Sequence, residues 1–400
     1  MDILVAHNFY KQAGGEDECV AAEVALLRAY GHKVTEYYLH NDALDKMGRA
    51  EALSRTIWSR PAFRELRQLL RKERPQIAHF HNTFPLMSPA AYYAAQAEDV
   101  RVVQTLHNYR LACVNAILFR QGAVCEDCLG KAVPWPGVLR KCYRDSYAAS
   151  AGVVAMLTAH RAIGTWRNLV DVYVALTENS RSKLVVSGLP ADKIAVKPNF
   201  AYPDPGVGAG KGGYAVYVGR LSSEKGVDTL LRAWRMLGGT LPLKVVGDGP
   251  LASEAREAAS GCAGVQWLGY LPLSRVYELI GDATVLVLPS QWQETFARVA
   301  MEAFAKGTPV IAAKLGAMAE IVEDGRTGLH FRPGDPADLA EKVRALLSDP
   351  VRLARMRQSA REYFERRFTA EANHDLLMSI YRRALEARPA RRHAEVALRV

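Results

Sequence analysis

The sequence predicts an α/β protein built from two doubly wound domains. A short apolar strand at residues 2–6 leads through a Gly-Gly loop into a helix, as at the start of a doubly wound sheet. The same order of strand, glycine loop and helix restarts at residue 214. Between the halves, residues 201–213 (AYPDPGVGAGKGG) are rich in Pro and Gly, which is typical of a linker and predicts the domain boundary.

Composition indicates a globular protein with anionic partners. The chain has 400 residues, 49% of them hydrophobic and 24% charged, and a net charge of +10. This charge favours nucleotide diphosphates, lipid diphosphates or an anionic bilayer, whereas no nucleic-acid-binding signature occurs. No run is long enough to span a membrane. The N-terminus enters a strand without a basic region or cleavage site, so we expect no signal peptide and a cytoplasmic protein.

Polar residues follow several predicted strands of the first half. Gly14 and Gly15 precede a helix predicted over residues 16–30, where they form either a phosphate-binding loop or a plain turn. His81 and His107 follow strands predicted at residues 76–80 and 100–106. A single His is more often structural, but two at comparable strand ends favour a ligand site.

Two further segments of the first half carry open alternatives. Residues 49–74 predict a basic helix, which is either a solvated face or a contact with a membrane or a lipid diphosphate. An insertion at about residues 110–144 holds Cys113, Cys125, Cys128 and Cys142. This spacing fits a structural zinc site of four thiolates. Four reduced thiols, two packed and two exposed, are the equal alternative.

In the second half, a strand, a glycine-containing loop and a helix again follow one another, and here the loop also carries two positively charged residues. Gly219, Arg220 and Lys225 follow the strand at residues 214–218 and precede a helix. Arg offers bidentate contacts and Lys a point charge, so the pair suits a diphosphate, although each alone is a common surface cation. Residues 247–249 (GDG) follow the next strand and indicate a turn.

Residues 289–311 predict strand, loop, helix and strand. We expect the helix to begin just after Glu294 and to stop at Gly307. Glu294 and Glu302 then lie two turns apart, within reach of one elongated ligand. Capping or a solvated face is the alternative for Glu294, whereas apolar neighbours around Glu302 demand a partner for its carboxylate.

This segment resembles the signature of retaining glycosyltransferases of family 4, which have the GT-B fold. The pattern PSxxxE, seven residues, a second Glu and then AxAxGxPVIA carries the resemblance, together with GRLxxEKG at residues 219–226. It implies two Rossmann-like domains facing across a cleft. Residues 1–200 would form the acceptor-side domain and 214–368 the nucleotide-sugar domain. A last helix within residues 369–400 would cross back to the first domain, ahead of a basic tail.

The resemblance also implies roles for individual residues. Arg220 and Lys225 would hold the donor diphosphate, Glu294 the sugar hydroxyls and Glu302 the ribose. His107 would lie near the donor sugar. Further donor-binding positions are those of the glycine loops and of the segment where the family often has Gly-Phe-Gly: Gly14, Gly15, Gly219, Gly247, Asp248, Gly249, Thr295, Phe296 and Ala297. Thr295 adds bulk near the donor sugar.

The implied activity is transfer of a sugar from a nucleotide diphosphate to a hydroxyl, with retention of the anomeric configuration. No DxD triplet occurs, so no catalytic metal is expected. The basic charge suggests a lipid-linked or glycan acceptor in cell-surface polysaccharide or glycolipid assembly, at the inner face of the membrane. The alternatives are a GT-B epimerase or phosphorylase, and a non-catalytic nucleotide-sugar-binding partner.

Overall fold

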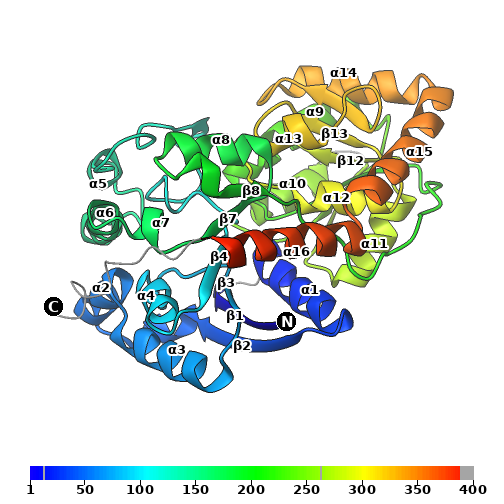
Figure 1. The fold of residues 1–400 in the computed structure, drawn as a ribbon. Coiled ribbons are helices and arrows are strands. Elements are labelled where there is room, and N and C mark those ends of the chain that lie inside the picture. Colours follow the sequence, from blue (N-terminus) through cyan, green and yellow to red (C-terminus); the bar gives the residue numbers. More distant parts are fainter. Residues whose placement is uncertain (12–13, 262–263, 388–400) are drawn as a thin grey trace. The chain divides into compact units, whose positions relative to one another are not determined.

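The computed structural model describes residues 1–11, 14–261 and 264–387, and its contacts divide the chain into two units (Figure 1). The first unit comprises Met1–Leu118, Glu126–Lys197 and the chain from His374. The second comprises Phe119–Cys125 and Pro198–Asn373. Each unit is built around one six-stranded parallel sheet. The predicted pair of doubly wound α/β domains is thus confirmed.

The sheet of the first unit has the order β2-β1-β3-β4-β7-β8. Strand order therefore reverses between β1 and β3, which is where doubly wound sheets bind ligands, outside the carboxyl ends of the strands. Strands β3, β4 and β7 are almost wholly buried, as expected for a parallel sheet covered on both faces. The six strands are Asp2–Phe9, Lys33–His40, Ile77–Phe80, Arg101–Thr105, Val172–Ala175 and Ile194–Val196, for β1, β2, β3, β4, β7 and β8.

Helices pack on both faces of this sheet. One face packs against α1 (Gly15–Ala29) and α16 (Ala370–Glu386) through Val20, Val24, Leu377 and Tyr381. The other face packs against α3, α4 and α6. The remaining helices of four or more residues are α2 (Arg49–Ile57), α3 (Arg60–Glu73), α4 (Ala90–Ala97), α5 (Pro136–Leu139), α6 (Tyr147–Ala162), α7 (Thr165–Asn168) and α8 (Glu178–Val186), with a short hairpin of β5 (Phe119–Arg120) and β6 (Ala123–Val124).

The basic segment 49–74 forms two helices rather than one. Helix α2 ends at Ile57, and α3 begins at Arg60 with Ser59 as its N-cap, whose side chain accepts a hydrogen bond from the Ala62 amide. Pro61 lies in the first turn of α3, where a missing N–H costs nothing. The cap and the proline begin a new helix, so the segment cannot continue as one helix.

The sheet of the second unit is also six-stranded and parallel, but its strand order differs and is β11-β10-β9-β12-β13-β14. Its reversal lies between β9 and β12. The strands in chain order are Ala215–Val218, Leu243–Val246, Val265–Gly269, Val285–Leu288, Val310–Ala313 and Gly328–Phe331, for β9 to β14. The helices are α9 (Val227–Leu237), α10 (Ala252–Gly261), α11 (Leu273–Asp282), α12 (Arg298–Ala305), α13 (Ala317–Ile321), α14 (Pro336–Leu347) and α15 (Pro350–Arg367).

The segment predicted as a flexible linker, residues 201–213, is held against the second unit. It forms no helix or strand, but the amides of Gly208 and Gly210 donate to the carbonyls of Lys306 and Gly281, both at 2.9 Å. The Arg361 guanidinium contacts the Asp204 carboxylate at 2.7 Å and lowers its pKa. Pro and Gly here permit close packing rather than free movement.

Helix α16 begins in the second unit, and most of it belongs to the first. From His374 onward it belongs to that unit, and the Tyr381 hydroxyl lies 2.8 Å from His79 Nδ1. The basic tail, residues 388–400, lies outside the described residues. Within the described part of the chain, no helix combines the length and apolarity that crossing a bilayer requires.

The loops that follow β9 and β12 come into close contact at one glycine. Gly226 begins α9 with φ +70°, and a Cβ at this position would lie 1.9 Å from the Pro289 carbonyl oxygen. Beside it, the Gln291 amide donates to the Glu224 carbonyl at 2.8 Å. Any side chain at residue 226 would push the two loops apart.

We predict that Gly226→Ala lowers the free energy of unfolding by about 3 kcal/mol or more, because it adds a backbone clash to the strain of positive φ. Gly238→Ala is the matched control, since Gly238 ends α9 with φ +57° and open space around a Cβ. It should cost only about 1 kcal/mol. Urea denaturation measures both, and equal losses would show that the contact with Pro289 is unimportant.

Candidate anion- and sugar-binding site

A buried ion pair links the two loops at the strand reversal of the second unit. Lys225 Nζ lies 2.9 Å from Glu294 Oε1, and the Ser290 hydroxyl donates to the same oxygen. Glu294 is only 4% exposed, whereas Lys225 is partly exposed and its ammonium lies 5.3 Å from the centre of the Trp292 ring. The structure therefore brings together two residues that the sequence places 69 positions apart.

Arg220 lies in the same loop as Lys225 and is exposed. Within the described part of the chain, no carboxylate pairs with its guanidinium. The Tyr217 hydroxyl donates to the Arg220 carbonyl at 2.9 Å and fixes the backbone there. Burial, together with Glu294 and Glu224, raises the pKa of Tyr217, so this hydroxyl keeps its proton. The Arg220 guanidinium is therefore available to bind an anion, and its backbone is held in place by Tyr217.

The predicted glycine turn at residues 247–249 contacts the loop after β9. Gly247 and Gly249 have φ +133° and +155°, and a Cβ on either would meet the carbonyl oxygen of Gly219 or Leu221 at 2.0 or 2.5 Å. The Leu221 amide donates to the Asp248 carbonyl at 2.9 Å. Glycine is thus needed here for close approach of two backbones. A Cβ on Gly219 would lie 3.2 Å from the Tyr217 hydroxyl, which would have to shift by a few tenths of an ångström.

The helix that carries Glu302 begins later than predicted. Helix α12 starts at Arg298, with Ala297 as its N-cap, so Glu294 lies in the preceding loop and not on the helix. The backbone of Glu294 explains the delay, because its amide donates to Trp292 and its carbonyl accepts from Ala317 on α13. Thr295, Phe296 and Ala297 are buried in this loop.

Glu302 has the partner that its buried position demands. Its carboxylate is 5% exposed and lies 3.0 Å from Arg298 Nε, one turn earlier on α12. Sequence analysis did not single out Arg298, although an i,i+4 pair of opposite charges is a recognisable signal. The Glu302 carboxylate therefore has a structural role, and a ligand that contacts it would do so alongside Arg298.

In the first unit, the Gly14-Gly15 turn starts α1 at the carboxyl end of β1. The Gly14 amide donates to Asp17 Oδ2 at 2.9 Å, and Asp17 Oδ1 lies 2.8 Å from Nε2 of the buried His7. His7 on β1 thereby fixes the turn through Asp17. Neither residue was predicted, because a His within a strand and an Asp in a first helical turn look ordinary in a sequence.

The carboxyl group of Glu16, beside this turn, has a shifted pKa. The sequence analysis did not single out this residue. Burial of its carboxyl and the neighbouring Asp17 raise the pKa of Glu16 to about 8, while hydrogen bonds from Tyr10 and Asn108 lower it. The Asn108 amide also donates to the Tyr10 hydroxyl at 3.1 Å. Tyr10, Glu16 and Asn108 follow β1 and β4, so they gather at the sheet edge where a ligand is expected.

The two histidines predicted at strand ends form a hydrogen bond. His81 Nδ1 lies 2.9 Å from His107 Nε2. His81 also contacts Glu23 on α1, together with His79, so that three potential metal ligands lie within 4.8 Å of one another. Lys197 Nζ lies 3.0 Å from the same carboxylate, however, and a cation already supplies the positive charge there.

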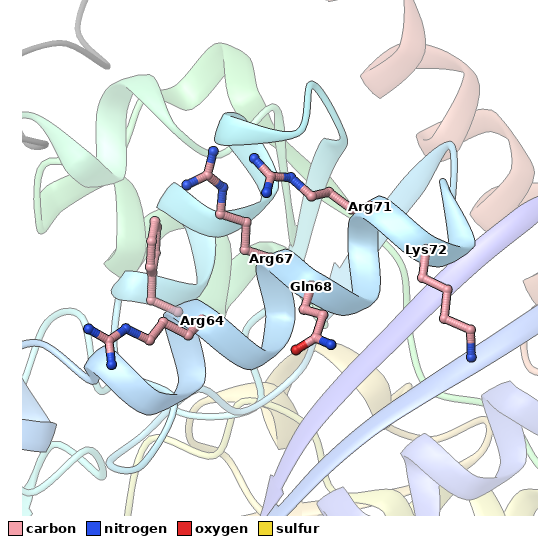
Figure 2. Close-up of a pocket in the computed structure, with 6 residues that line it drawn as sticks. Arg64, Arg67, Gln68, Arg71 and Lys72 are labelled. Carbon is pink, nitrogen blue, oxygen red and sulfur yellow. The ribbon is translucent and has the colours of Figure 1, made fainter.

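Helix α3 presents a row of cations around a hollow of about 690 Å³ (Figure 2). Arg67 and Arg71 both contact Glu98, at 2.6 and 2.9 Å. Arg64 and Lys72 carry the remaining charge of the row. The lining residues are Phe63, Arg64, Arg67, Gln68, Arg71 and Lys72.

The cysteines of the insertion differ in burial and contacts. Cys113 and Cys128 are buried, and Cys125 and Cys142 are half-buried. The Cys113 thiol donates to Asn115 Oδ1 at 2.8 Å, and the Cys128 thiol to the Pro134 carbonyl at 3.8 Å. These contacts suit reduced thiols and leave the zinc site a prediction.

Comparison with known proteins covers both units. Residues 14–204 match the family described as Glycosyltransferase Family 4, and residues 206–363 match Glycosyl transferases group 1. The D-inositol 3-phosphate glycosyltransferase of Acidothermus cellulolyticus is 30% identical over 346 residues, which cover 80% of this chain and 70% of that protein. The glycogen synthase of Mycobacterium tuberculosis is 37% identical over 154 residues, or 37% of each chain.

A solved structure confirms the fold expected from the sequence. The HepE protein of Anabaena in complex with UDP-glucose has a TM-score of 0.66 and 16% identity, with 94% of this chain and 99% of that chain covered. Its similarity spans both parallel-sheet units. The two family matches and the similarity to the Acidothermus enzyme show that the chain belongs to glycosyltransferase family 4, and the solved structure shows that it has the GT-B fold.

Proposed function

We propose that the protein transfers a sugar from a nucleotide-diphosphate sugar to a hydroxyl acceptor, with retention of the anomeric configuration. The observation that carries the proposal is the arrangement at the strand reversal of the second unit, where exposed Arg220 lies in the same loop as Lys225, which pairs with Glu294. A cation poised for phosphate and a carboxylate poised for hydroxyls are the two groups that such a donor requires. Family membership supports the same reading.

The proposed chemistry depends on stabilising the leaving diphosphate. As the bond from the anomeric carbon to the phosphate oxygen breaks, negative charge grows on the phosphate, and Arg220, Lys225 and the amides before α12 would stabilise it. The acceptor oxygen would bond to the anomeric carbon on the same face and pass its proton to the leaving phosphate. No step calls for a metal ion.

Glu294 would hold sugar hydroxyls and Glu302 the ribose. Ser290 and Lys225 fix the Glu294 carboxylate before any ligand arrives. Binding of a ligand therefore costs little side-chain conformational entropy at Glu294. Since the HepE structure contains UDP-glucose, UDP-sugars are the first donors to test. An epimerase, a phosphorylase or a non-catalytic binding partner would give no glycosylated acceptor under turnover.

We predict that one of UDP, GDP and ADP binds in calorimetry, and that Glu302→Gln weakens its binding by about 1–3 kcal/mol through loss of a charged hydrogen bond. Arg298→Met tests the structural alternative. If Glu302 only pairs with Arg298, both variants lose stability and neither changes the dissociation constant. Glu341→Gln, an exposed change on α14, is the control. Absence of binding for all three nucleotides at millimolar concentration would contradict the proposal.

We further propose that the acceptor is membrane-associated and that α3 contacts the anionic surface, at the inner face of the membrane in cell-surface glycan assembly. The support is the row of cations on α3 and its hollow (Figure 2). Arg64 and Lys72 contribute most to such a contact, because Glu98 already neutralises part of the charge of Arg67 and Arg71.

We predict that the protein sediments with vesicles containing anionic lipid, and that Arg64→Gln/Lys72→Gln reduces the bound fraction severalfold at about 0.1 M salt. Arg235→Gln/Arg355→Gln removes the same charge from exposed positions of the second unit and should bind as the wild type does. Equal binding by both double variants would assign the effect to net charge alone. Transfer only to soluble acceptors, with no vesicle binding, would refute the proposal.

The four cysteines of the insertion are proposed as a structural zinc site. Zinc analysis of protein purified under reducing conditions without chelator should give about one ion per chain. Cys125→Ser/Cys128→Ser should lower the ratio toward zero, whereas Cys19→Ala, outside the cluster, should not change it. A ratio near zero in the wild type would leave four reduced thiols as the answer.

A further inference from the structure

An arginine of the first unit packs against aromatic rings and forms no ion pair with any carboxylate of the described residues. The Cζ atom of Arg110 lies 4.3 Å from the centre of the Phe84 ring and 5.2 Å from that of Tyr143. One of its amino groups, Nη1, donates to the Val114 carbonyl. Burial lowers the pKa of Arg110, because water solvates the charge poorly there. An anion bound to this guanidinium would restore the lost solvation.

The contacts of Arg110 come from loops at the carboxyl edge of the sheet. Tyr10 follows β1, Phe84 follows β3 and Asn108 follows β4. The Arg110 amide donates to Asn108 Oδ1 at 3.0 Å. Burial raises the pKa of Tyr10, and Arg110 lies close enough to oppose this effect. Arg110 is therefore held at the edge where the strand order reverses and where such sheets bind ligands.

Uncharged hydrogen-bonding groups lie beside Arg110. The Asn108 side chain donates to the Tyr10 hydroxyl at 3.1 Å, and both residues form hydrogen bonds with the Glu16 carboxyl group. Oε1 of Glu16 is nevertheless buried without a hydrogen-bond partner among the described residues. Burial and Asp17 raise the pKa of Glu16 to about 8, so near pH 7 most molecules have an O–H at this position. We call the following four residues the Arg110 cluster: Tyr10, Glu16, Asn108 and Arg110.

We propose that the Arg110 cluster binds a phosphate-type oxyanion carried by the sugar acceptor. A guanidinium already fixed by ring contacts binds such a group with little loss of entropy, and neutral O–H and N–H donors add to it. The assignment to the acceptor rests on the proposed function, whereas oxyanion binding by the first unit does not. The substrate class is then an anionic acceptor, since a neutral one would leave the charge of Arg110 uncompensated.

The experiment observes Arg110 itself, through its Nε–H signal in ¹H–¹⁵N spectra of the full-length protein, assigned with Arg110→Lys. Sulfate at constant ionic strength is the probe, because its charge does not change near neutral pH. The signal should shift and saturate, with a dissociation constant of about 10 mM or below. Tyr10→Phe should weaken binding severalfold, and Tyr147→Phe, at an exposed tyrosine of the same unit, should not. A shift that never saturates would overturn the site.

The pH profile tests the part played by Glu16. Sulfate affinity should fall by about tenfold from pH 7 to pH 9, because Glu16 loses its proton and its negative charge then repels the anion. The other ionisable groups facing Glu16 are Asp17 and Tyr10, and Tyr10 keeps its proton because its pKa is raised well above the ordinary value. Glu16→Gln should bind sulfate equally at both pH values. The same fall in this variant would overturn the role of Glu16.

Competition against sulfate identifies the source of the oxyanion. Displacement by both glucose 1-phosphate and farnesyl diphosphate would show that the oxyanion itself is recognised. Displacement by farnesyl diphosphate alone would assign the site to a lipid diphosphate. Displacement by neither would overturn the proposal.

Turnover connects the site to the acceptor. Arg110→Gln should raise KM for a phosphorylated acceptor about tenfold with little change in kcat. The matched control is Arg144→Gln, since exposed Arg144 lies 5.4 Å from the same Tyr143 ring, and it should leave KM unchanged. If Arg110→Gln does not fold, the wild-type titration and Tyr10→Phe still decide.

The two proposals fail separately. Saturable sulfate binding at Arg110 in a protein that transfers no sugar would refute the proposed function and leave the oxyanion site standing. Sugar transfer with an Arg110 signal that ignores sulfate would do the reverse.

Discussion

One constraint governs the arrangement of polar residues in this protein. In a doubly wound parallel sheet the carboxyl ends of all strands meet at one edge, and the loops diverge where strand order reverses. The reversal lies between β1 and β3 in the first unit and between β9 and β12 in the second. Glu294 and Lys225 follow the second pair of strands, and His81 follows one strand of the first. Without the reversal these loops would be covered by crossing helices.

The two units handle buried charge differently. In the second, Glu294 is buried against a lysine that remains partly exposed, so an arriving anion can share the lysine without first breaking into the core. In the first, Glu23 and Lys197 are both almost wholly buried, and such a pair stabilises little by itself.

Much of the architecture could be predicted from the sequence, because apolar strands and glycine loops are local signals. The loop residues Gly226, Gly247 and Gly249 illustrate why, since their conformations and contacts tolerate no side chain. The boundaries of the helices were harder to predict from the sequence. The late start of α12 depends on the Glu294 carbonyl accepting from Ala317, a contact that no local pattern announces. The break between α2 and α3 was missed although Ser59 and Pro61 signalled it.

The residues that hold the site in place were the hardest to find. Asp17, Glu23 and Arg298 lie inside helices or at their starts, where acidic and basic residues are common and usually solvated. Their importance arises from partners distant in sequence or buried by folding, such as Lys197 for Glu23.

By itself, then, the sequence determined the two parallel-sheet domains, the family and the loops that carry Arg220, Lys225, Glu294 and His107. These follow from short-range patterns of hydrophobicity, glycine and charge. Only the tertiary structure decided which charges are paired, which of them are buried, and that residues 201–213 are bound to the second unit. Pairing and protonation depend on distances between segments and on exclusion of water, and both exist only after the chain has folded.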